Sequence, residues 1–181
     1  MREKLIGWLS DMPLKGPLTA FGLSIALAAF LVDRLSKWWL IEIYGIAERG
    51  IVTVLPFFDL VMAWNRGISY GLFQADTAVG VALLASFAIV VTAALTLWLA
   101  RINHRLMALS IGLIIGGAIG NIYDRIVFGA VADFFSLHAY GYYWYIFNIA
   151  DIWIAFGVIL MIYDSFFPVA EETEAGQSGK K

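Results

Sequence analysis

Long apolar runs dominate the pattern of hydrophobic and polar positions along this chain. The helices expected from these runs are residues 18–40, 78–100, 106–123 and 146–167. A helix of about 20 residues crosses the ~30 Å hydrocarbon layer of a membrane. The first run is apolar only as far as Val32, so its helix must continue through the polar residues Asp33 to Lys37 to reach the membrane surface. The pattern therefore predicts four transmembrane helices in a single domain of residues 1–170.

Two connecting segments do not have a helical pattern. One lies between the first and second runs, and the other lies between the third and fourth. Residues 44–64 have no helical period, and their β-branched and aromatic residues gather around Pro56, which predicts a small β hairpin at the membrane surface. Residues 128–145 end in a dense aromatic cluster, which is typical of the headgroup layer. We therefore expect an all-α membrane protein with four transmembrane helices, a small extracytoplasmic β hairpin or cradle, and an interfacial aromatic segment.

The two ends of the chain carry weaker signals. Residues 1–16 place apolar side chains on one helical stripe, which predicts a short helix lying on the membrane surface. A cleaved signal peptide is the alternative, although the cleavage-like Ala26-Leu27-Ala28 lies inside the first apolar run. Residues 171–181 are charged, small and polar, and we expect a disordered tail.

Composition supports the membrane setting and excludes several kinds of site. The chain is 61% hydrophobic and 14% charged, with a mean hydropathy of +0.81. A net charge of -2 argues against nucleic acid as a partner. Cysteine is absent and only two histidines are present, so disulfides, a cysteine nucleophile and a multi-histidine metal centre are excluded. We expect neither a metal nor a cofactor.

Orientation in the membrane follows from the basic residues. Four helices place both termini on one side, and the loop of residues 101–105 on that side is basic and free of acids, which indicates the cytoplasm. The polar motifs around Asp33, Asn65, Asp124 and Asp151 then all face outward. In a bacterium this is the extracytoplasmic face of the inner membrane.

Two of these motifs share the pattern N-x-x-D, with Asn121 before Asp124 and Asn148 before Asp151. Both acids lie where an apolar run meets water, and an ionisable residue there is costly and functional by default. Two carboxyl groups in a poorly hydrated site do not both ionise easily, so one keeps its proton while the other acts as a base. We predict that Asp124 and Asp151 are a catalytic pair that activates water to split an amide. An N-x-x-D motif can also be a helix cap, and Asn148 could be one.

Other motifs leave alternatives open. Asp33 and Lys37 are spaced i,i+4, so they either anchor a helix end as an ion pair or support the site. Residues 67–71 match G-x-S-x-G, which would make Ser69 a nucleophile, but a glycine-rich turn explains them as well. Glycines at positions 112, 116 and 120 predict a close-packed helix face.

A small proton-coupled transporter is the alternative function. Its acids should lie near the middle of the membrane, reachable from both sides, whereas these acids lie at one rim.

The chain also resembles a known family, the lipoprotein signal peptidases or signal peptidase II. The matching blocks, in order, are Asp33-Arg34-Leu35-Ser36-Lys37, Asn65-Arg66-Gly67-Ile68-Ser69-Tyr70-Gly71, Gly116-Gly117-Ala118-Ile119-Gly120-Asn121-Ile122-Tyr123-Asp124-Arg125, Val131-Ala132-Asp133-Phe134 and Phe147-Asn148-Ile149-Ala150-Asp151. Arg34 stands where the family often has glutamine, Ser36 where threonine is common and Tyr70 where phenylalanine is usual.

The resemblance implies an aspartyl endopeptidase of the bacterial inner membrane that removes prolipoprotein signal peptides just before a diacylglyceryl-modified cysteine. It implies Asp124 and Asp151 as the catalytic pair. Residues at the other matching positions are implied to bind substrate or support the pair: Asp33, Lys37, Asn65, Gly67, Asn121, Arg125, Asp133, Asn148 and Ala150. It also implies membrane lipids and the family's cyclic peptide inhibitors as partners.

Overall fold

The computed structural model describes residues 15–67 and 77–167. Three sequence-based expectations lie outside these residues: most of the surface helix of residues 1–16, the nucleophile candidate Ser69, and the tail of residues 171–181. Everything below concerns the described residues.

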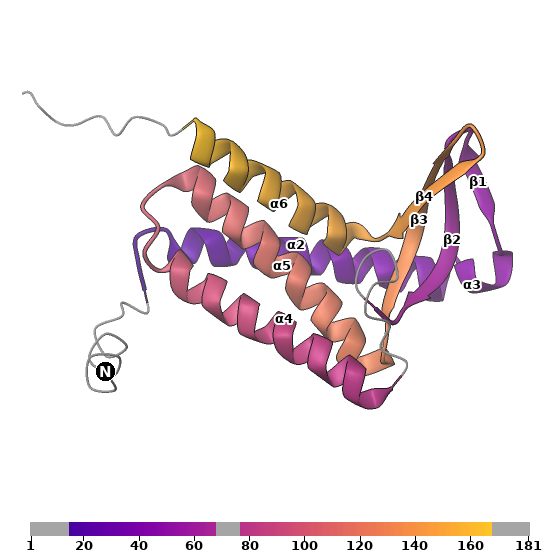
Figure 1. The fold of residues 1–181 in the computed structure, drawn as a ribbon, viewed down its shortest axis with the longest axis horizontal. Coiled ribbons are helices and arrows are strands. Elements are labelled where there is room, and N and C mark those ends of the chain that lie inside the picture. Colours follow the sequence, from indigo (N-terminus) through magenta and orange to yellow (C-terminus); the bar gives the residue numbers. More distant parts are fainter. Residues whose placement is uncertain (1–14, 68–76, 168–181) are drawn as a thin grey trace, which may run out of the picture.

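Long helices run side by side and form a bundle, with a β sheet at one end (Figure 1). They are α2 (Thr19–Trp38), α4 (Ala78–Leu99), α5 (Arg105–Phe128) and α6 (Ile149–Phe166). A short π-helix, η1 (Trp39–Ile43), continues α2. In the described part of the chain, four helices are long and apolar enough to cross a membrane, counting α2 with η1. Four such helices were expected from the sequence, but α5 continues to Phe128 instead of ending at Tyr123, and α6 begins at Ile149 because residues 146–147 belong to a β strand.

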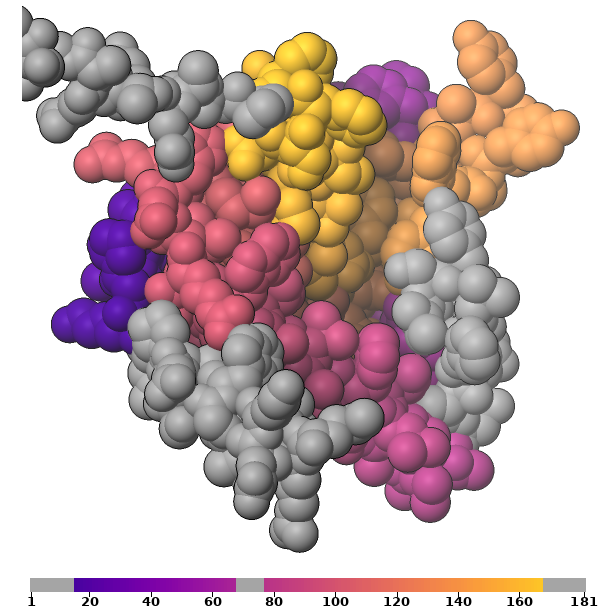
Figure 2. Space-filling view, turned by 60° about the vertical axis from the view of Figure 1, so that its left-hand side comes forward, coloured from indigo at the N-terminus to yellow at the C-terminus, as the bar shows by residue number. Residues whose placement is uncertain are grey.

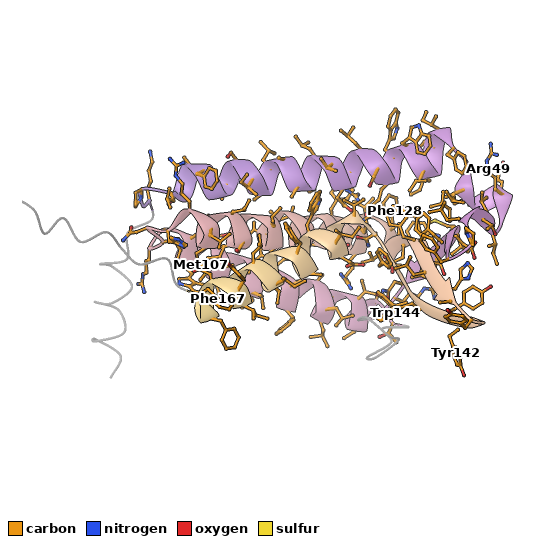
Figure 3. All side chains as sticks on the ribbon, turned by 90° about the horizontal axis from the view of Figure 1, so that it is seen from above. Arg49, Met107, Phe128, Tyr142, Trp144 and Phe167 are labelled. Atoms are coloured by element: carbon orange, nitrogen blue, oxygen red, sulfur yellow. The ribbon has the colours of Figure 1, made fainter. Side chains whose placement is uncertain are left out.

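Helix α5 is the centre of the bundle. Over its membrane-length apolar stretch 67% of α5 is buried, against 6% for α4. Seen from the end remote from the sheet, α5 lies between α2 and α6, with α4 below (Figure 2). Side chains point outward along the helices, with Met107 and Phe167 at the end away from the sheet (Figure 3). Helix α5 is therefore the element that can position groups from α2 and α6 against one another.

Glycines on α5 let two neighbouring backbones approach. A Cβ at Gly116 would collide with the carbonyl oxygen of Ala26 on α2, and one at Gly117 would collide with that of Ala150 on α6. The close-packed glycine face predicted from the sequence is confirmed, and it serves α2. Gly117 adds a second face that the four-residue spacing did not include.

The sheet consists of β1 (Val52–Leu55), β2 (Phe58–Asn65), β3 (Val131–Ala139) and β4 (Tyr142–Phe147), antiparallel and in that order. The hairpin expected within residues 44–64 is confirmed as β1 and β2. The description "all-α" is wrong, because the aromatic segment forms a second hairpin that pairs with β2. The turn of this second hairpin has Tyr140 and Gly141 at positive φ. Bulky aromatic residues such as those of β4 are common in β strands as well as in the headgroup layer of a membrane.

One face of the sheet packs on η1 and on the short helix α3 (Ile46–Arg49). Leu40 and Ile46 from these helices form a buried cluster with Ala132 and Phe134 of β3. Successive residues of a strand point to opposite faces. Burying Ala132 and Phe134 therefore directs Asp133 to the other face of the sheet.

Candidate active site

The polar motifs of the sequence meet where the sheet joins the bundle. Asp33 and Lys37 come from α2, Asn121, Asp124 and Arg125 from α5, Asn65 from β2, Asp133 from β3, and Asn148, Ala150 and Asp151 from the start of α6. Direct contacts link these groups over sequence separations of up to 117 residues. The convergence expected at one end of the bundle is what the structure shows.

Asp151 is placed by the first turn of α6. Asn148 is the N-cap: its side-chain oxygen accepts from the Asp151 N–H at 3.1 Å, and the Asn148 N–H donates to Asp151 Oδ2 at 3.3 Å. This reciprocal capping box satisfies two helix-end donors. The possibility that Asn148 caps a helix is confirmed, and the cap leaves Asp151 Oδ1 to accept from Asn121 Nδ2 at 2.9 Å.

Asp133 is buried, with 1% of its surface exposed, and amide groups surround it. Asn148 Nδ2 donates to its Oδ1 at 2.6 Å and Asn65 Nδ2 donates to its Oδ2 at 3.0 Å. Burial raises the pKa of Asp133 from 3.8 to about 7, and the nearby charge of Asp151 raises it further against the effect of the two amides. A carboxyl group in this environment holds a proton near neutral pH.

Asn148 and Asn121 connect the two carboxyl groups. The Asn148 amide that donates to Asp133 also donates to Asn121 Oδ1 at 3.2 Å, and Asn121 donates onward to Asp151. The side chains of Asp133 and Asp151 are therefore joined through two asparagines, and each carboxyl group accepts from amide donors.

Asp124 lies in a different environment. Its side chain is fully buried between two cations, with Arg34 Nη2 at 2.7 Å from Oδ1 and Lys37 Nζ at 2.7 Å from Oδ2. The Ala132 N–H also donates to Oδ2, at 3.3 Å. Both oxygens of Asp124 are therefore occupied by cations and by a backbone N–H.

Asp33 shares the same cations. The expected i,i+4 pair with Lys37 is present at 3.1 Å, and Arg34 Nη2 lies 3.2 Å from the same oxygen. The other oxygen of Asp33 accepts from the Ala150 N–H at 3.1 Å. Lys37 and Asp33 are almost completely buried, so the pair is an internal feature and not a surface anchor.

Arg125 holds the chain that follows β2. Its Nη2 donates to the Gly67 carbonyl at 2.9 Å and its Nη1 to the Asn121 carbonyl at 3.3 Å. Asn65 Oδ1 accepts from the Gly67 N–H at 3.0 Å. The N–H and the carbonyl of Gly67 are thus both hydrogen-bonded. Two of the Arg125 N–H groups donate to backbone carbonyls and are not directed at a substrate.

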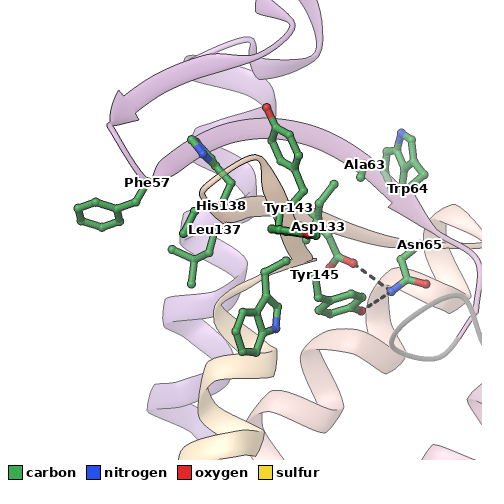
Figure 4. Close-up of a pocket in the computed structure, with 13 residues that line it drawn as sticks. Phe57, Ala63, Trp64, Asn65, Asp133, Leu137, His138, Tyr143 and Tyr145 are labelled. Atoms are coloured by element: carbon green, nitrogen blue, oxygen red, sulfur yellow. Dashed lines mark hydrogen bonds between the residues drawn. The ribbon is translucent and has the colours of Figure 1, made fainter.

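Two cavities open beside the carboxyl groups. One, of about 1080 Å³, lies over the sheet and is lined by Asp133, Asn65, Tyr145 and residues of β3 and β4. In Figure 4 Asn65 lies between Asp133 and Tyr145, donating to both, at 2.8 Å to the Tyr145 hydroxyl. The second, of about 680 Å³, runs along α6 from Asp151 to Ile159 and shares Asn65 and Tyr145 with the first. The pair Asp133 and Asp151 therefore lies where two mostly apolar cavities meet.

Asp124 lines neither of these cavities; it borders a separate hollow of about 240 Å³ together with Arg34 and Lys37. The expectation that Asp124 and Asp151 act on one water thus does not match the contacts of Asp124. The family resemblance implied only a substrate-binding or supporting role for Asp133, which is not part of an N-x-x-D motif. An acid between the apolar residues Ala132 and Phe134 was the signal that could have singled it out.

Comparison with known proteins shows the family of the chain. The family model described as signal peptidase (SPase) II matches residues 25–167. The chain belongs to the signal peptidase II family. All the residues discussed above fall within the matched range, and the family is one of peptidases. The transporter alternative is therefore not supported.

Relatives and solved structures extend the comparison. A lipoprotein signal peptidase of Nitrobacter hamburgensis is 49% identical over 149 residues, covering 80% of this chain and 91% of that protein. One from Rhodopseudomonas palustris is 48% identical over 148 residues, covering 80% and 90%. A solved bacterial membrane enzyme superimposes with a TM-score of 0.70 at 25% identity, covering 88% of this chain and 98% of that one. This signal peptidase II family member is thus a multi-pass membrane protein.

Proposed function

We propose that this chain is an aspartic endopeptidase that removes signal peptides from prolipoproteins immediately before a diacylglyceryl-modified cysteine. Membership of the signal peptidase II family supports the substrate class. The observation that carries the aspartic mechanism is the pair Asp133 and Asp151, two carboxyl groups joined through Asn148 and Asn121 where two cavities meet.

In this proposal Asp133 takes the catalytic place that the sequence assigned to Asp124. A hydrolytic pair needs one carboxyl that holds a proton and one that accepts a proton from water. Burial gives Asp133 a pKa of about 7, which suits the proton donor. Asp124 is occupied by Arg34 and Lys37, so its role is structural.

The reaction proceeds by addition of water to the scissile carbonyl. Ionised Asp151 takes a proton from a water molecule as the water oxygen bonds to the carbonyl carbon, and protonated Asp133 donates its proton to the carbonyl oxygen. The tetrahedral intermediate then collapses: the carbon–nitrogen bond breaks, and the proton held by Asp151 passes to the leaving amine of the cysteine. Asp133 recovers its proton from the gem-diol, so both carboxyl groups return to their starting states.

The two cavities place the substrate on either side of this pair. The cavity along α6 is lined by Ile152, Ala155, Phe156 and Ile159, and its apolar character suits the membrane-embedded part of the substrate. The cavity over the sheet suits the chain beyond the cysteine, at the water side. The family's cyclic peptide inhibitors would enter the same space, and membrane lipids would surround the exposed faces of α4 and α6.

The protein lies in the bacterial inner membrane with both termini cytoplasmic and the sheet on the extracytoplasmic face. The aromatic tip of the sheet supports this placement, since Tyr142 and Trp144 are 82% and 70% exposed and belong at a membrane surface. The basic loop between α4 and α5 lies at the opposite end of the bundle.

Incubating the purified protein with a diacylglyceryl-modified prolipoprotein and measuring product mass tests the function. Cleavage before the modified cysteine is expected. Asp133→Asn and Asp151→Asn should each lower kcat by roughly 10³-fold or more while the protein stays folded, because each removes a proton-transfer group. Ser69→Ala should cleave normally. Wild-type cleavage by the Asp133 variant would refute this pair, and complete loss with intact folding in the Ser69 variant would favour a serine nucleophile.

A further inference from the structure

Two of the buried aspartates outside the proposed catalytic pair, Asp33 and Asp124, make the same kind of contact. Asp33 Oδ1 accepts from the backbone N–H of Ala150 at 3.1 Å, and Asp124 Oδ2 accepts from that of Ala132 at 3.3 Å. Ala150 immediately precedes Asp151, and Ala132 immediately precedes Asp133. Asp33 and Asp124 therefore each hold the N–H of the residue that precedes one member of the proposed catalytic pair.

Two cations hold both aspartates at once. Arg34 Nη2 lies 2.7 Å from Asp124 and 3.2 Å from Asp33, and Lys37 Nζ lies 2.7 Å and 3.1 Å from the same two residues. All four possible ion pairs are formed, and the two negative and two positive charges balance. Buried charges are tolerated only when they are paired in this way. Loss of either cation leaves one excess negative charge inside the protein.

Besides these two backbone contacts, a chain of side-chain hydrogen bonds connects Lys37 to Asp151. Lys37 Nζ donates to Asn121 Oδ1 at 3.4 Å, and Asn121 Nδ2 donates to Asp151 Oδ1. Arg34 is fixed from the other side, since its guanidinium lies over the ring of Tyr123, 4.6 Å from the centroid. The cluster is thus a rigid connection between α2, the start of β3 and the start of α6.

We propose that Arg34 and Lys37 are positioning residues for the reaction: through Asp124 and Asp33 they fix the peptide groups of Ala132 and Ala150, and so set the separation of Asp133 and Asp151. This inference rests on the proposed function, because it concerns the geometry of that pair. Asp124 contacts two cations because its carboxylate holds the start of β3 through the Ala132 N–H.

Kinetics of Arg34→Gln and Arg34→Lys test the proposal. Arg34→Gln removes the charge, and a small misplacement of reacting groups costs up to about 10²-fold, so kcat should fall roughly tenfold to a hundredfold while KM for the lipidated substrate changes little. Arg34→Lys should recover most of the lost kcat. The matched control is Arg49→Gln, since Arg49 also lies over a tyrosine ring, that of Tyr44 at 4.4 Å, but contacts no aspartate in the described structure. Its kcat should be unchanged.

Hydrogen exchange tests the positioning separately from the chemistry. Arg34 lies closer to Asp124 than to Asp33, so Arg34→Gln should speed exchange of the Ala132 amide more than that of Ala150. Wild-type kcat, or unchanged exchange at Ala132, would overturn the proposal. If Arg34→Gln does not fold, the Arg34→Lys variant decides. Full kcat together with wild-type exchange of the Ala132 amide supports positioning by the charge of residue 34. Full kcat together with faster exchange of that amide refutes it. Full activity of Asp133→Asn would refute the catalytic pair alone, leaving the exchange result intact.

Discussion

Two pairs of aspartates lie side by side in this protein and differ in what surrounds them. Asp33 and Asp124 are fully buried and each contacts both Arg34 and Lys37. Asp133 and Asp151 accept instead from asparagine side chains and line the two large cavities.

The difference lies in what compensates the buried carboxyl groups. The cations beside Asp33 and Asp124 use the lone pairs of both carboxyl groups, which also hold backbone N–H groups. Neutral amides orient a carboxyl group without neutralising it, and burial raises the pKa of Asp133 to about 7. In the proposed mechanism, amide surroundings therefore distinguish the acids that exchange protons from the acids that hold backbone, even though all four lie at one end of one bundle.

The largest expected effect comes from unbalancing the cationic pair. Lys37→Ala leaves two buried carboxylates with only Arg34 and should destabilise the fold by about 3–5 kcal/mol. Asp33→Asn combined with Lys37→Met leaves Asp124 paired with Arg34 and should lose less. Thermal unfolding in detergent, followed by tryptophan fluorescence, compares the two. A double variant less stable than Lys37→Ala would show that the ion pairs do not set the stability.

The second effect concerns pH and the amide-surrounded pair. The pKa of Asp133 rises from 3.8 in the unfolded chain to about 7 in the folded protein, so its contribution to stability is complete below pH 3.8 and is lost as pH rises through about 7. Asp133→Asn should therefore gain stability over wild type between pH 4 and pH 8, by at most roughly 4 kcal/mol.

Unfolding midpoints at several pH values measure this difference. The control is Glu48→Gln on the exposed surface of α3, which should track wild type at every pH. A constant offset between Asp133→Asn and wild type would mean that Asp133 titrates normally.

A smaller effect separates the two roles of Asn148. Serine is a good N-cap but lacks the amide that donates to Asp133 and Asn121. Asn148→Ser should keep the free energy of unfolding within about 1 kcal/mol and lower kcat by roughly tenfold or more. Asn148→Ala should lose both stability and kcat. Equal kcat for Asn148→Ser and wild type would show that the amide bridge is dispensable.

The smallest effect sets a baseline away from both pairs. The Thr77 hydroxyl caps α4 by accepting from the Gly80 N–H at 3.1 Å. Thr77→Ala should cost about 1 kcal/mol of stability and leave kcat unchanged. A fall in kcat as large as that of Asn148→Ser would mean that activity follows overall stability. The loss of kcat in Asn148→Ser would then say nothing about the surroundings of Asp133 and Asp151.

The sequence by itself determined the membrane-spanning helices, the first hairpin and the end of the bundle at which the polar groups meet. These features follow from periodicity and from the cost of exposing backbone or charge to hydrocarbon, which act locally along the chain. The pair of Asp33 and Lys37 was also readable, because i,i+4 spacing fixes its geometry within one helix. Asn148 as a cap was readable for the same reason.

Only the tertiary structure decided which aspartates form ion pairs with cations and which accept hydrogen bonds from amides. Arg34 and Lys37 reach Asp124 from another helix, and Asn65 reaches Asp133 from another strand, so no local pattern could assign these partners. The second hairpin escaped prediction because an aromatic cluster suits a headgroup layer and a strand equally well. The environment of a buried carboxyl group depends on what the whole fold brings to it, and that environment separates Asp133 from Asp124.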